Sequence, residues 1–159
     1  MRGNFEKCLA ITLREEGGYS NDAGDPGGMT MEGITQREYN LWRRLHHLAK
    51  RWVKRISHEE LVAIYKAEYW DACKCDELEA GVDLVVFDFA VNSGVGRALH
   101  TPRSGTSTVE IIHRYSLARL AYDKGLKRLW PRFGKGWQRR ILRVEHNALV
   151  MAHASNRAA

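Results

Sequence analysis

Hydrophobic and polar positions along most of the chain repeat with the three-to-four-residue spacing of amphipathic helices. Residues 5–16 are predicted as the first of these helices, because their apolar side chains fall on one face: Phe5, Cys8, Leu9, Thr12 and Leu13. Gly17 and Gly18 are expected to end it. The next segment, residues 20–30, is rich in Gly, Asp, Asn and Ser, which predicts a loop or a short hairpin.

Two capping boxes, in which a Ser or Thr is followed three residues later by Glu, predict where the next helices begin. The first box starts at Thr35 and opens a helix that runs through Trp42. Apolar positions continue the pattern over residues 45–56, behind a face that is dense in Arg, Lys and His. The second box starts at Ser57 and opens a helix that ends near Trp70.

The most apolar stretch of the chain runs from Val82 to Val95 and predicts a central buried helix. A polar loop is expected over residues 100–106, followed by helices near 107–124 and 135–154. We find no internal repeat. The pattern therefore predicts a mainly α domain of six to eight helices, with at most one small β-hairpin near residues 19–35.

Composition and charge narrow the choice of partners only partly. The chain has 159 residues, which fits one domain, and 25 Lys and Arg against 19 Asp and Glu give a formal charge of +6. Such a charge attracts polyanions, and nucleic acid and the anionic bacterial wall are both candidates. The basic residues are densest over residues 37–55, where a wall-binding face and an ordinary solvated face are the alternatives.

The cysteines and the N-terminus bear on the compartment. Free thiols in a reducing cytosol are expected, because the three cysteines are an odd number and Cys73 and Cys75 lack the CxxC spacing. The N-terminal residues lack the apolar core of a signal peptide, and no run approaches membrane-spanning length. We therefore expect a chain made in the cytoplasm without a signal peptide, which other machinery must export if its substrate lies outside the membrane.

Glu16 is the carboxylic acid that needs an explanation. It falls on the apolar face of the first predicted helix, and its neighbour Glu15 points to solvent. Burial and the negative end of the helix dipole both disfavour a charged carboxylate there. Both effects favour an acid that holds its proton near neutral pH, as a glycosidase requires. The alternative is a structural acid that is ion-paired to a buried Arg.

A second carboxylate follows in the Gly-rich segment. Asp25 lies in a turn that lets its side chain project into a groove, and Thr30 and Thr35 supply hydroxyls that would hold a water. Inverting glycosidases use two carboxyl groups separated widely enough to admit a water. Two carboxylates near one loop are common by chance, so this pairing does not by itself identify an enzyme.

Three short motifs stand in order near the N-terminus: Glu16-Gly17-Gly18-Tyr19, Asp25-Pro26-Gly27-Gly28-x-Thr30 and Gly33-Ile34-Thr35. Together they closely resemble the opening signature of the glycoside hydrolase 108 muramidases, which belong to the lysozyme-like superfamily. Looser similarity follows at three further segments: Tyr65-x-x-x-Tyr69-Trp70, Asp88-Phe89-x-x-x-Asn92-x-Gly94 and Phe133-Gly134-x-Gly136-Trp137-x-x-Arg140.

The resemblance implies a division of the chain and roles for several residues. A catalytic lysozyme-like region would cover residues 1–100, and a C-terminal helical region would pack on it over 101–159, shortened relative to the family's peptidoglycan-binding segment. In the family the Glu of the first motif is the catalytic acid, which implies this role for Glu16. By analogy with phage lysozymes, Asp25 is the second carboxylate, or else shapes the Gly-rich loop, and Thr30 is its hydroxyl partner.

Four more residues are candidates for binding substrate. Aromatic faces pack against the CH groups of sugar rings, which makes Tyr19, Tyr69 and Trp70 candidates to line a groove, with a place in the core as the alternative for each. Asn92 ends an apolar run, so its amide needs a partner if it is buried. It is expected either to contact an N-acetyl group or to cap a loop backbone.

The resemblance implies a muramidase that hydrolyses the β-1,4 bond between N-acetylmuramic acid and N-acetylglucosamine in bacterial peptidoglycan. No metal and no organic cofactor are implied. Its partners would be the glycan strands, in the periplasm or cell wall, and a holin or a secretion machinery would export it. The alternatives are a lytic transglycosylase, a non-catalytic wall-binding module and a basic helical nucleic-acid binder.

Overall fold

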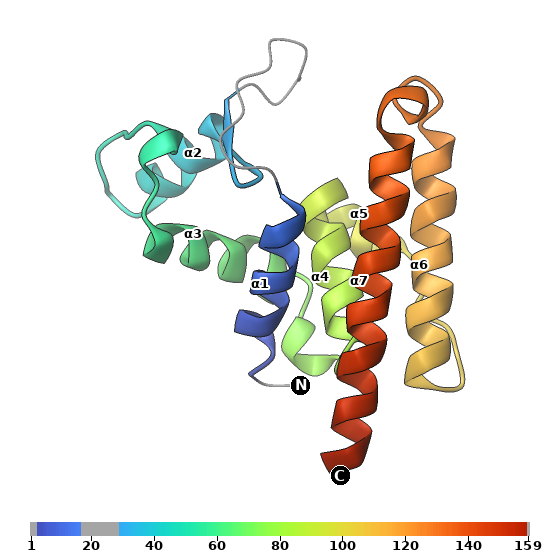
Figure 1. Cartoon of the computed structure of the whole chain (residues 1–159). Coiled ribbons are helices and arrows are strands. Elements are labelled where there is room, and N and C mark those ends of the chain that lie inside the picture. Colours follow the sequence, from blue (N-terminus) through green and yellow to red (C-terminus); the bar gives the residue numbers. More distant parts are fainter. Residues whose placement is uncertain (1–2, 17–28, 159) are drawn as a thin grey trace.

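A computed structural model describes residues 3–16 and 29–158 of the chain (Figure 1). In this part the chain forms seven α-helices: α1 (Phe5–Glu15), α2 (Gln36–Leu45), α3 (His58–Tyr65), α4 (Val82–Ser93), α5 (Val95–His100), α6 (Thr108–Gly125) and α7 (Trp130–Ala158). Short helical turns of other types occupy Val53–Arg55, Lys66–Asp71 and Cys75–Glu77. The prediction of a mainly α fold with six to eight helices and one small hairpin is confirmed.

The hairpin consists of strands β1 (Thr30–Met31) and β2 (Ile34–Thr35). The two strands are antiparallel, and Thr30 pairs with Thr35 in their register. The turn between them contains Gly33, whose φ of +80° lies in the left-handed region that glycine adopts without a steric cost. The hairpin leads directly into α2, because Thr35 is also the N-cap of that helix.

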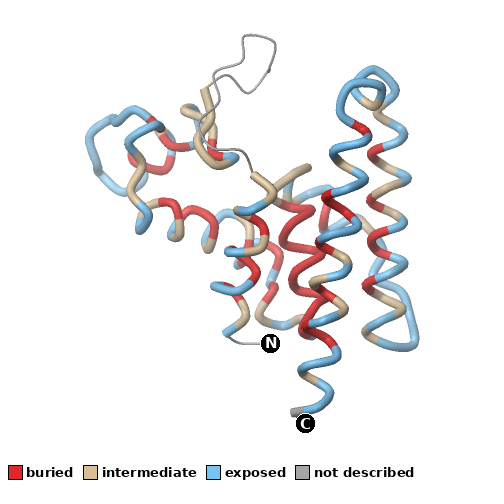
Figure 2. Tube along the Cα trace, viewed as in Figure 1, coloured by how far each residue is buried: buried red, intermediate tan, exposed pale blue. Residues whose placement is uncertain are grey.

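Helix α4 is the centre of the molecule, and the other long helices pack around it. It contacts α1, α5, α6 and α7, while α6 and α7 form a long antiparallel pair at one side (Figure 1). Buried residues concentrate on α4 and on the faces turned toward it (Figure 2). Gly81 precedes α4 and allows close approach to α7, since a Cβ there would collide with the backbone of Ala148.

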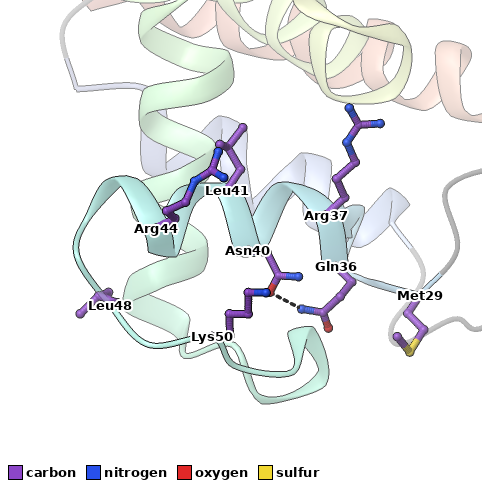
Figure 3. Close-up of a pocket in the computed structure, with 8 residues that line it drawn as sticks. All are labelled: Met29, Gln36, Arg37, Asn40, Leu41, Arg44, Leu48 and Lys50. Atoms are coloured by element: carbon purple, nitrogen blue, oxygen red, sulfur yellow. Dashed lines mark hydrogen bonds between the residues drawn. The ribbon is translucent and has the colours of Figure 1, made fainter.

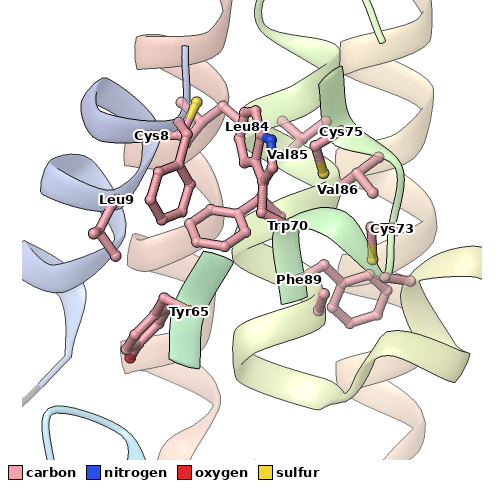
Figure 4. Close-up of a cluster of buried hydrophobic side chains, with 14 of the residues drawn as sticks. Cys8, Leu9, Tyr65, Trp70, Cys73, Cys75, Leu84, Val85, Val86 and Phe89 are labelled. Carbon is pink, nitrogen blue, oxygen red and sulfur yellow. The ribbon is translucent and has the colours of Figure 1, made fainter. Parts of the chain in front are cut away.

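The aromatic part of the core lies where α1, α3 and α4 meet. Trp70 is fully buried and packs edge-to-face on Phe5 and Phe87, with ring centroids 5.4 Å apart in both pairs. Burial of one such side chain stabilises the fold by about 1.5–3 kcal/mol. Cys8, Cys73 and Cys75 are free, buried thiols of the same core (Figure 4).

Both predicted capping boxes are present. The side chain of Thr35 accepts a hydrogen bond from the backbone N–H of Glu38, and the side chain of Glu38 accepts one from the backbone N–H of Thr35. Ser57 and Glu60 make the same reciprocal pair at the start of α3. Each box satisfies two backbone donors that a helix leaves without partners at its first turn.

Two predicted helix boundaries are wrong. The helical pattern over residues 45–56 does not continue, because α2 ends at Leu45 and His47 takes a left-handed φ of +56°. The Nε of Arg43 donates to the carbonyl oxygen of Ala49 at 2.5 Å, which holds the chain in a turn after α2. The last helix begins at Trp130 instead of near residue 135, since Pro131 fits a first helical turn, where backbone N–H groups have no helical partner.

Candidate active site

Glu16 lies directly after the last residue of α1, and its carboxylate meets the last helix of the chain. Its Oε1 is 2.6 Å from Nη1 of Arg140, which belongs to α7, and the exposed fractions of the two side chains are 16% and 8%. The ion pair with a buried arginine, stated above as the alternative for Glu16, is therefore present. Helices α1 and α7 lie side by side in Figure 1, and this ion pair connects the end of the first helix to the last helix of the chain.

The other carboxylate oxygen of Glu16 faces the β-hairpin. A Cβ at Gly33 would lie 3.0 Å from Glu16 Oε2 and 3.0 Å from the hydroxyl oxygen of Tyr65. That hydroxyl donates a hydrogen bond to the carbonyl oxygen of Glu32 at 2.5 Å, which ties the hairpin turn to α3. The Glu16 side chain is consequently held between α7 and the hairpin that carries Thr30.

Arg140 is itself oriented by a fully buried carboxylate, Asp88 of α4. The Nε and Nη2 of Arg140 donate to Asp88 at 3.0 and 2.9 Å, and Nη1 of Arg119 donates to the same carboxylate at 2.6 Å. Burial alone would raise the pKa of Asp88, but the two guanidinium groups outweigh it and hold this pKa below its usual range. The forked contact leaves Nη1 of Arg140 for Glu16.

A second buried carboxyl lies near the two arginines. Asp123 of α6 is 2% exposed. Burial raises its pKa, while the charges of Arg119 and Arg140 act in the opposite direction. Two cations and two carboxyl groups other than Glu16 therefore share this part of the interior.

Tyr69 lies beside a groove and close enough to Glu16 for the charge of that carboxylate to act on its hydroxyl group. It lines a cavity of about 310 Å³ with residues of α2, α3, the helical turn Lys66–Asp71 and the start of α5: Glu38, Leu41, Trp42, Leu45, Ile64, Glu68, Gly94 and Val95. Burial raises the pKa of Tyr69, and the negative charges of Glu38 and Glu16 raise it further. Its ring centroid is 5.5 Å from that of Tyr65. Tyr69 thus connects the groove to the surroundings of Glu16.

Trp70 does not share this position, and the expectation that it lines a groove needs correction. Its side chain is 0% exposed and is enclosed by Phe5 and Phe87. Adjacent residues of a helical segment point in different directions, so Tyr69 and Trp70 cannot both face the groove. Trp70 takes the core position that was the alternative for it.

Asn92 lies half-buried at the end of α4, above Asp88. Its Oδ1 accepts a hydrogen bond from Nη2 of Arg119 at 3.1 Å. The amide oxygen is therefore bound by the same arginine that binds Asp88, instead of by the loop backbone. Asp25 and Tyr19, the remaining predicted site residues, lie outside the described part of the chain.

The basic region predicted over residues 37–55 forms the wall of a wide groove on α2 (Figure 3). This groove measures about 780 Å³, and its basic lining residues are Arg37, Arg44 and Lys50. Gln36 and Asn40 supply amide groups between them and are hydrogen-bonded to each other at 2.9 Å. The groove offers cationic side chains to an anionic group in solution.

Sequence reasoning did not assign roles to Arg140, Asp88, Gly33 and Tyr65. One signal was available for Asp88, because a carboxylate inside the most apolar segment of a chain requires a buried cation. The apolar positions Val144 and Ala148 also place Arg140 on the buried face of α7, at helical spacing. Neither signal identifies Glu16 as the third member of the group.

The described residues contain neither a cluster of metal ligands nor a membrane-spanning helix. No group of three or more His, Cys, Asp and Glu side chains within residues 3–16 and 29–158 is arranged to hold a metal ion. Over the same residues, no helix has the length and apolar content needed to cross a bilayer.

Comparison with known proteins finds matches in a family model and among solved structures. The family model described as Glycosyl hydrolase 108 matches residues 9–94, which include Glu16, the hairpin and α4. The solved structure of SagA from Brucella abortus aligns with a TM-score of 0.82 and 32% sequence identity, over 96% of this chain and 97% of that chain. No curated protein matches the chain.

Proposed function

This chain belongs to the glycosyl hydrolase 108 family, and from that membership we propose that it is a muramidase acting on bacterial peptidoglycan. It hydrolyses the β-1,4 bond between N-acetylmuramic acid and N-acetylglucosamine, with Glu16 as the general acid. The observation that carries the proposal is the position of the Glu16 carboxylate, with one oxygen on Arg140 and the other beside Gly33 and Tyr65. One acid held in a defined orientation is what protonation of a leaving oxygen requires.

In this mechanism the proton of Glu16 passes to the glycosidic oxygen as the bond to the anomeric carbon breaks, and water attacks that carbon. The reaction leaves Glu16 as a carboxylate. Arg140 stabilises that carboxylate through the charge of its guanidinium, 2.6 Å away. Its own charge is shared with Asp88, which keeps the guanidinium in place in both protonation states of Glu16.

Asp25 is the second carboxylate in the proposal. It positions or activates the attacking water, or stabilises the positive charge that develops on the sugar ring. Thr30 supplies a hydroxyl to the same water. Support for Asp25 comes from its place in the Gly-rich motif, and support for Thr30 comes from its place in the hairpin that contains Gly33.

Substrate would lie along the groove that Tyr69 lines, with its sugar rings over the tyrosine face. Tyr19 and Asn92 are further candidates for binding substrate. Tyr19 follows Glu16 by three residues in the sequence, and Asn92 accepts a hydrogen bond from Arg119, which also binds Asp88. The chain would act in the periplasm or cell wall after export through a holin or a secretion machinery. The cationic groove of α2 would hold it on the anionic wall.

Digestion of purified peptidoglycan, with the released fragments weighed by mass spectrometry, tests the proposal. A muramidase releases muropeptides that end in a reducing N-acetylmuramic acid. Fragments lighter by one water, which end in a 1,6-anhydro sugar, would make the chain a lytic transglycosylase. Binding to peptidoglycan without release of soluble fragments, over walls with different peptide cross-links, would leave a wall-binding module.

A further inference from the structure

Three aromatic side chains at the beginning of α7 continue the face of the helix that carries Arg140. Trp130, Phe133 and Trp137 precede Arg140 at intervals of three and four residues, which places all four on one side of the helix. The rings of Phe133 and Trp137 are stacked, with centroids 5.7 Å apart and an interplanar angle of 25°. Trp130 and Trp137 have centroids 6.4 Å apart.

These rings are open to solvent, unlike the aromatic residues of the core. Phe133 is 40% exposed, and Trp130 and Trp137 are half-buried. The guanidinium carbon of Arg132 lies 5.0 Å from the centroid of the Phe133 ring. Apolar side chains that are exposed together on one face, in contrast to scattered single ones, mark binding surfaces.

Gly134 makes room within the helix for the ring of Trp130. A Cβ at this buried position would lie 2.5 Å from Cδ2 of Trp130, so glycine leaves the space that the indole ring occupies. Glycine inside a helix costs about 1 kcal/mol relative to alanine. Gly134 therefore lowers the stability of the helix but allows the Trp130 ring to take its observed position.

The three aromatic residues extend away from the Glu16–Arg140 pair along the axis of α7. With a rise of 1.5 Å per residue, Trp137 stands roughly 4–5 Å from Arg140 along the axis of α7, and Trp130 roughly 15 Å. The beginning of α7 extends past the end of α1, where Glu16 lies (Figure 1). A chain of sugar rings bound at Glu16 can therefore continue onto the aromatic faces.

We propose that Trp130, Phe133 and Trp137 form a saccharide-binding platform for the glycan strand, beyond the sugars on either side of the cleaved bond. The proposal rests on the proposed function, since it extends the same site. The three rings form one cluster, with centroids 5.7 and 6.4 Å apart in its two pairs, and the CH groups of sugar rings pack on exposed aromatic side chains of this kind. The platform would make affinity depend on strand length.

The test measures binding without hydrolysis. In a Glu16→Gln background, the dissociation constants of the N-acetylglucosamine hexamer and dimer are determined by titration calorimetry. Phe133→Ala and Trp137→Ala are each expected to weaken hexamer binding by about tenfold, the size expected for loss of one aromatic contact, and to leave dimer binding unchanged. Gly134→Ala is expected to weaken hexamer binding too, because it displaces the Trp130 ring without removing an aromatic residue.

Leu142→Ala is the matched control. Leu142 is 56% exposed and lies two residues after Arg140, on the opposite side of α7, so its loss is expected to leave both dissociation constants unchanged. Unchanged hexamer binding in folded Phe133→Ala, Trp137→Ala and Gly134→Ala variants would overturn the platform. A second result would also overturn it: the wild type binds vesicles of anionic phospholipid, and the variants lose this binding while they still bind the hexamer as the wild type does.

The outcome is independent of catalysis. If the wild type failed to cut peptidoglycan while hexamer binding still depended on the three rings, the muramidase proposal would fail and the platform would stand. If the wild type cut peptidoglycan and the three variants bound the hexamer as Leu142→Ala does, the platform alone would fail.

Discussion

Nη1 of Arg140 lies 2.6 Å from Oε1 of Glu16, so the last helix of the chain supplies a partner for a residue at the end of the first. The family match over residues 9–94 contains Glu16 and Asp88 but ends before Arg140. The C-terminal helical region is thus part of the candidate active site, in addition to packing against the rest of the fold. Its contribution depends on both Asp88 and the position of α7.

Replacement of Arg140 by lysine should separate positioning from charge. A lysine ammonium keeps the charge but cannot make the forked contact to Asp88 and reach Glu16 at the same time. We expect Arg140→Lys to lower kcat by at least about tenfold with a smaller change in KM, as loss of an interaction with the acid during proton transfer predicts. Steady-state rates on soluble peptidoglycan strands measure this effect.

Arg143→Lys is the control for that substitution. Arg143 is three residues further along α7 and pairs with Glu15 at the surface, with 57% of its side chain exposed. Exposed ion pairs contribute little to stability. Its rate should match the wild type, and an equal loss of kcat in both variants would contradict a specific role for Arg140.

Gly33→Ala should damage the site through the hairpin. The φ of +80° is unfavourable for alanine, at a cost of about 1–2 kcal/mol, and the new methyl group would press on the Glu16 carboxylate and the Tyr65 hydroxyl. We expect activity on peptidoglycan to fall at temperatures where the variant is still folded. The comparison is Gly96→Ala in α5, where a Cβ meets no atom within 4 Å and alanine favours the helix. Similar activity in both variants would show that the turn does not constrain Glu16.

Tyr65→Phe removes the hydroxyl that binds the carbonyl oxygen of Glu32 and borders Glu16. The partly buried carbonyl loses this hydrogen bond, at a cost of about 0.5–1.5 kcal/mol. Activity on peptidoglycan should fall together with the midpoint of thermal unfolding. A variant that unfolds at the wild-type temperature would mean that the hydroxyl does not fix the hairpin turn.

The buried Asp88 predicts how stability depends on pH. Its pKa is lowered in the folded protein, where the charges of Arg119 and Arg140 outweigh the opposing effect of burial. Its carboxylate therefore contributes stability that is complete above its unfolded pKa of about 3.9 and is lost as pH falls through the lower folded value. Near pH 7, Asp88→Asn should lower the free energy of unfolding by about 3–5 kcal/mol, because it leaves two buried cations with a neutral partner.

Chemical denaturation of wild type and Asp88→Asn at several pH values measures this difference. The gap between the two proteins should narrow below about pH 4, as the wild type loses the same charge. A gap that stays constant from neutral to acidic pH would indicate that Asp88 acts through packing alone.

Local sequence signals predicted much of the fold. The capping pairs at Thr35 and Ser57 define their helices because the hydrogen bonds form between residues three positions apart. The broad apolar stripe from Val82 predicted α4 for a similar reason, since helical spacing acts over one or two turns. The end of α2 was missed, because it depends on the contact of Arg43 with the Ala49 carbonyl, which no periodicity reveals.

The surroundings of Glu16 could be predicted only in part. Motif spacing singled out Glu16. Of the two alternatives that the sequence left open, the ion-paired carboxylate is the one seen in the contact with Arg140, and the role of Glu16 as the catalytic acid stays a prediction. The partner itself comes from the far end of the chain, so only tertiary packing identifies it. Trp70 was misplaced for the reverse reason: an aromatic residue next to Tyr69 looks equivalent in sequence, but the helix turns it into the core.

The central claim, that Glu16 is the catalytic acid, is tested most directly by the rate of peptidoglycan digestion in Glu16→Gln and Glu15→Gln. The two substitutions remove the same charge at adjacent positions, but the Glu15 carboxylate pairs with Arg143, whose side chain is 57% exposed, and not with Arg140. General acid catalysis contributes about 10²- to 10⁴-fold, so Glu16→Gln should lose at least about a hundredfold in rate while Glu15→Gln digests peptidoglycan much as the wild type does. A Glu16→Gln protein that releases reducing muropeptides at a rate near that of Glu15→Gln would contradict the account.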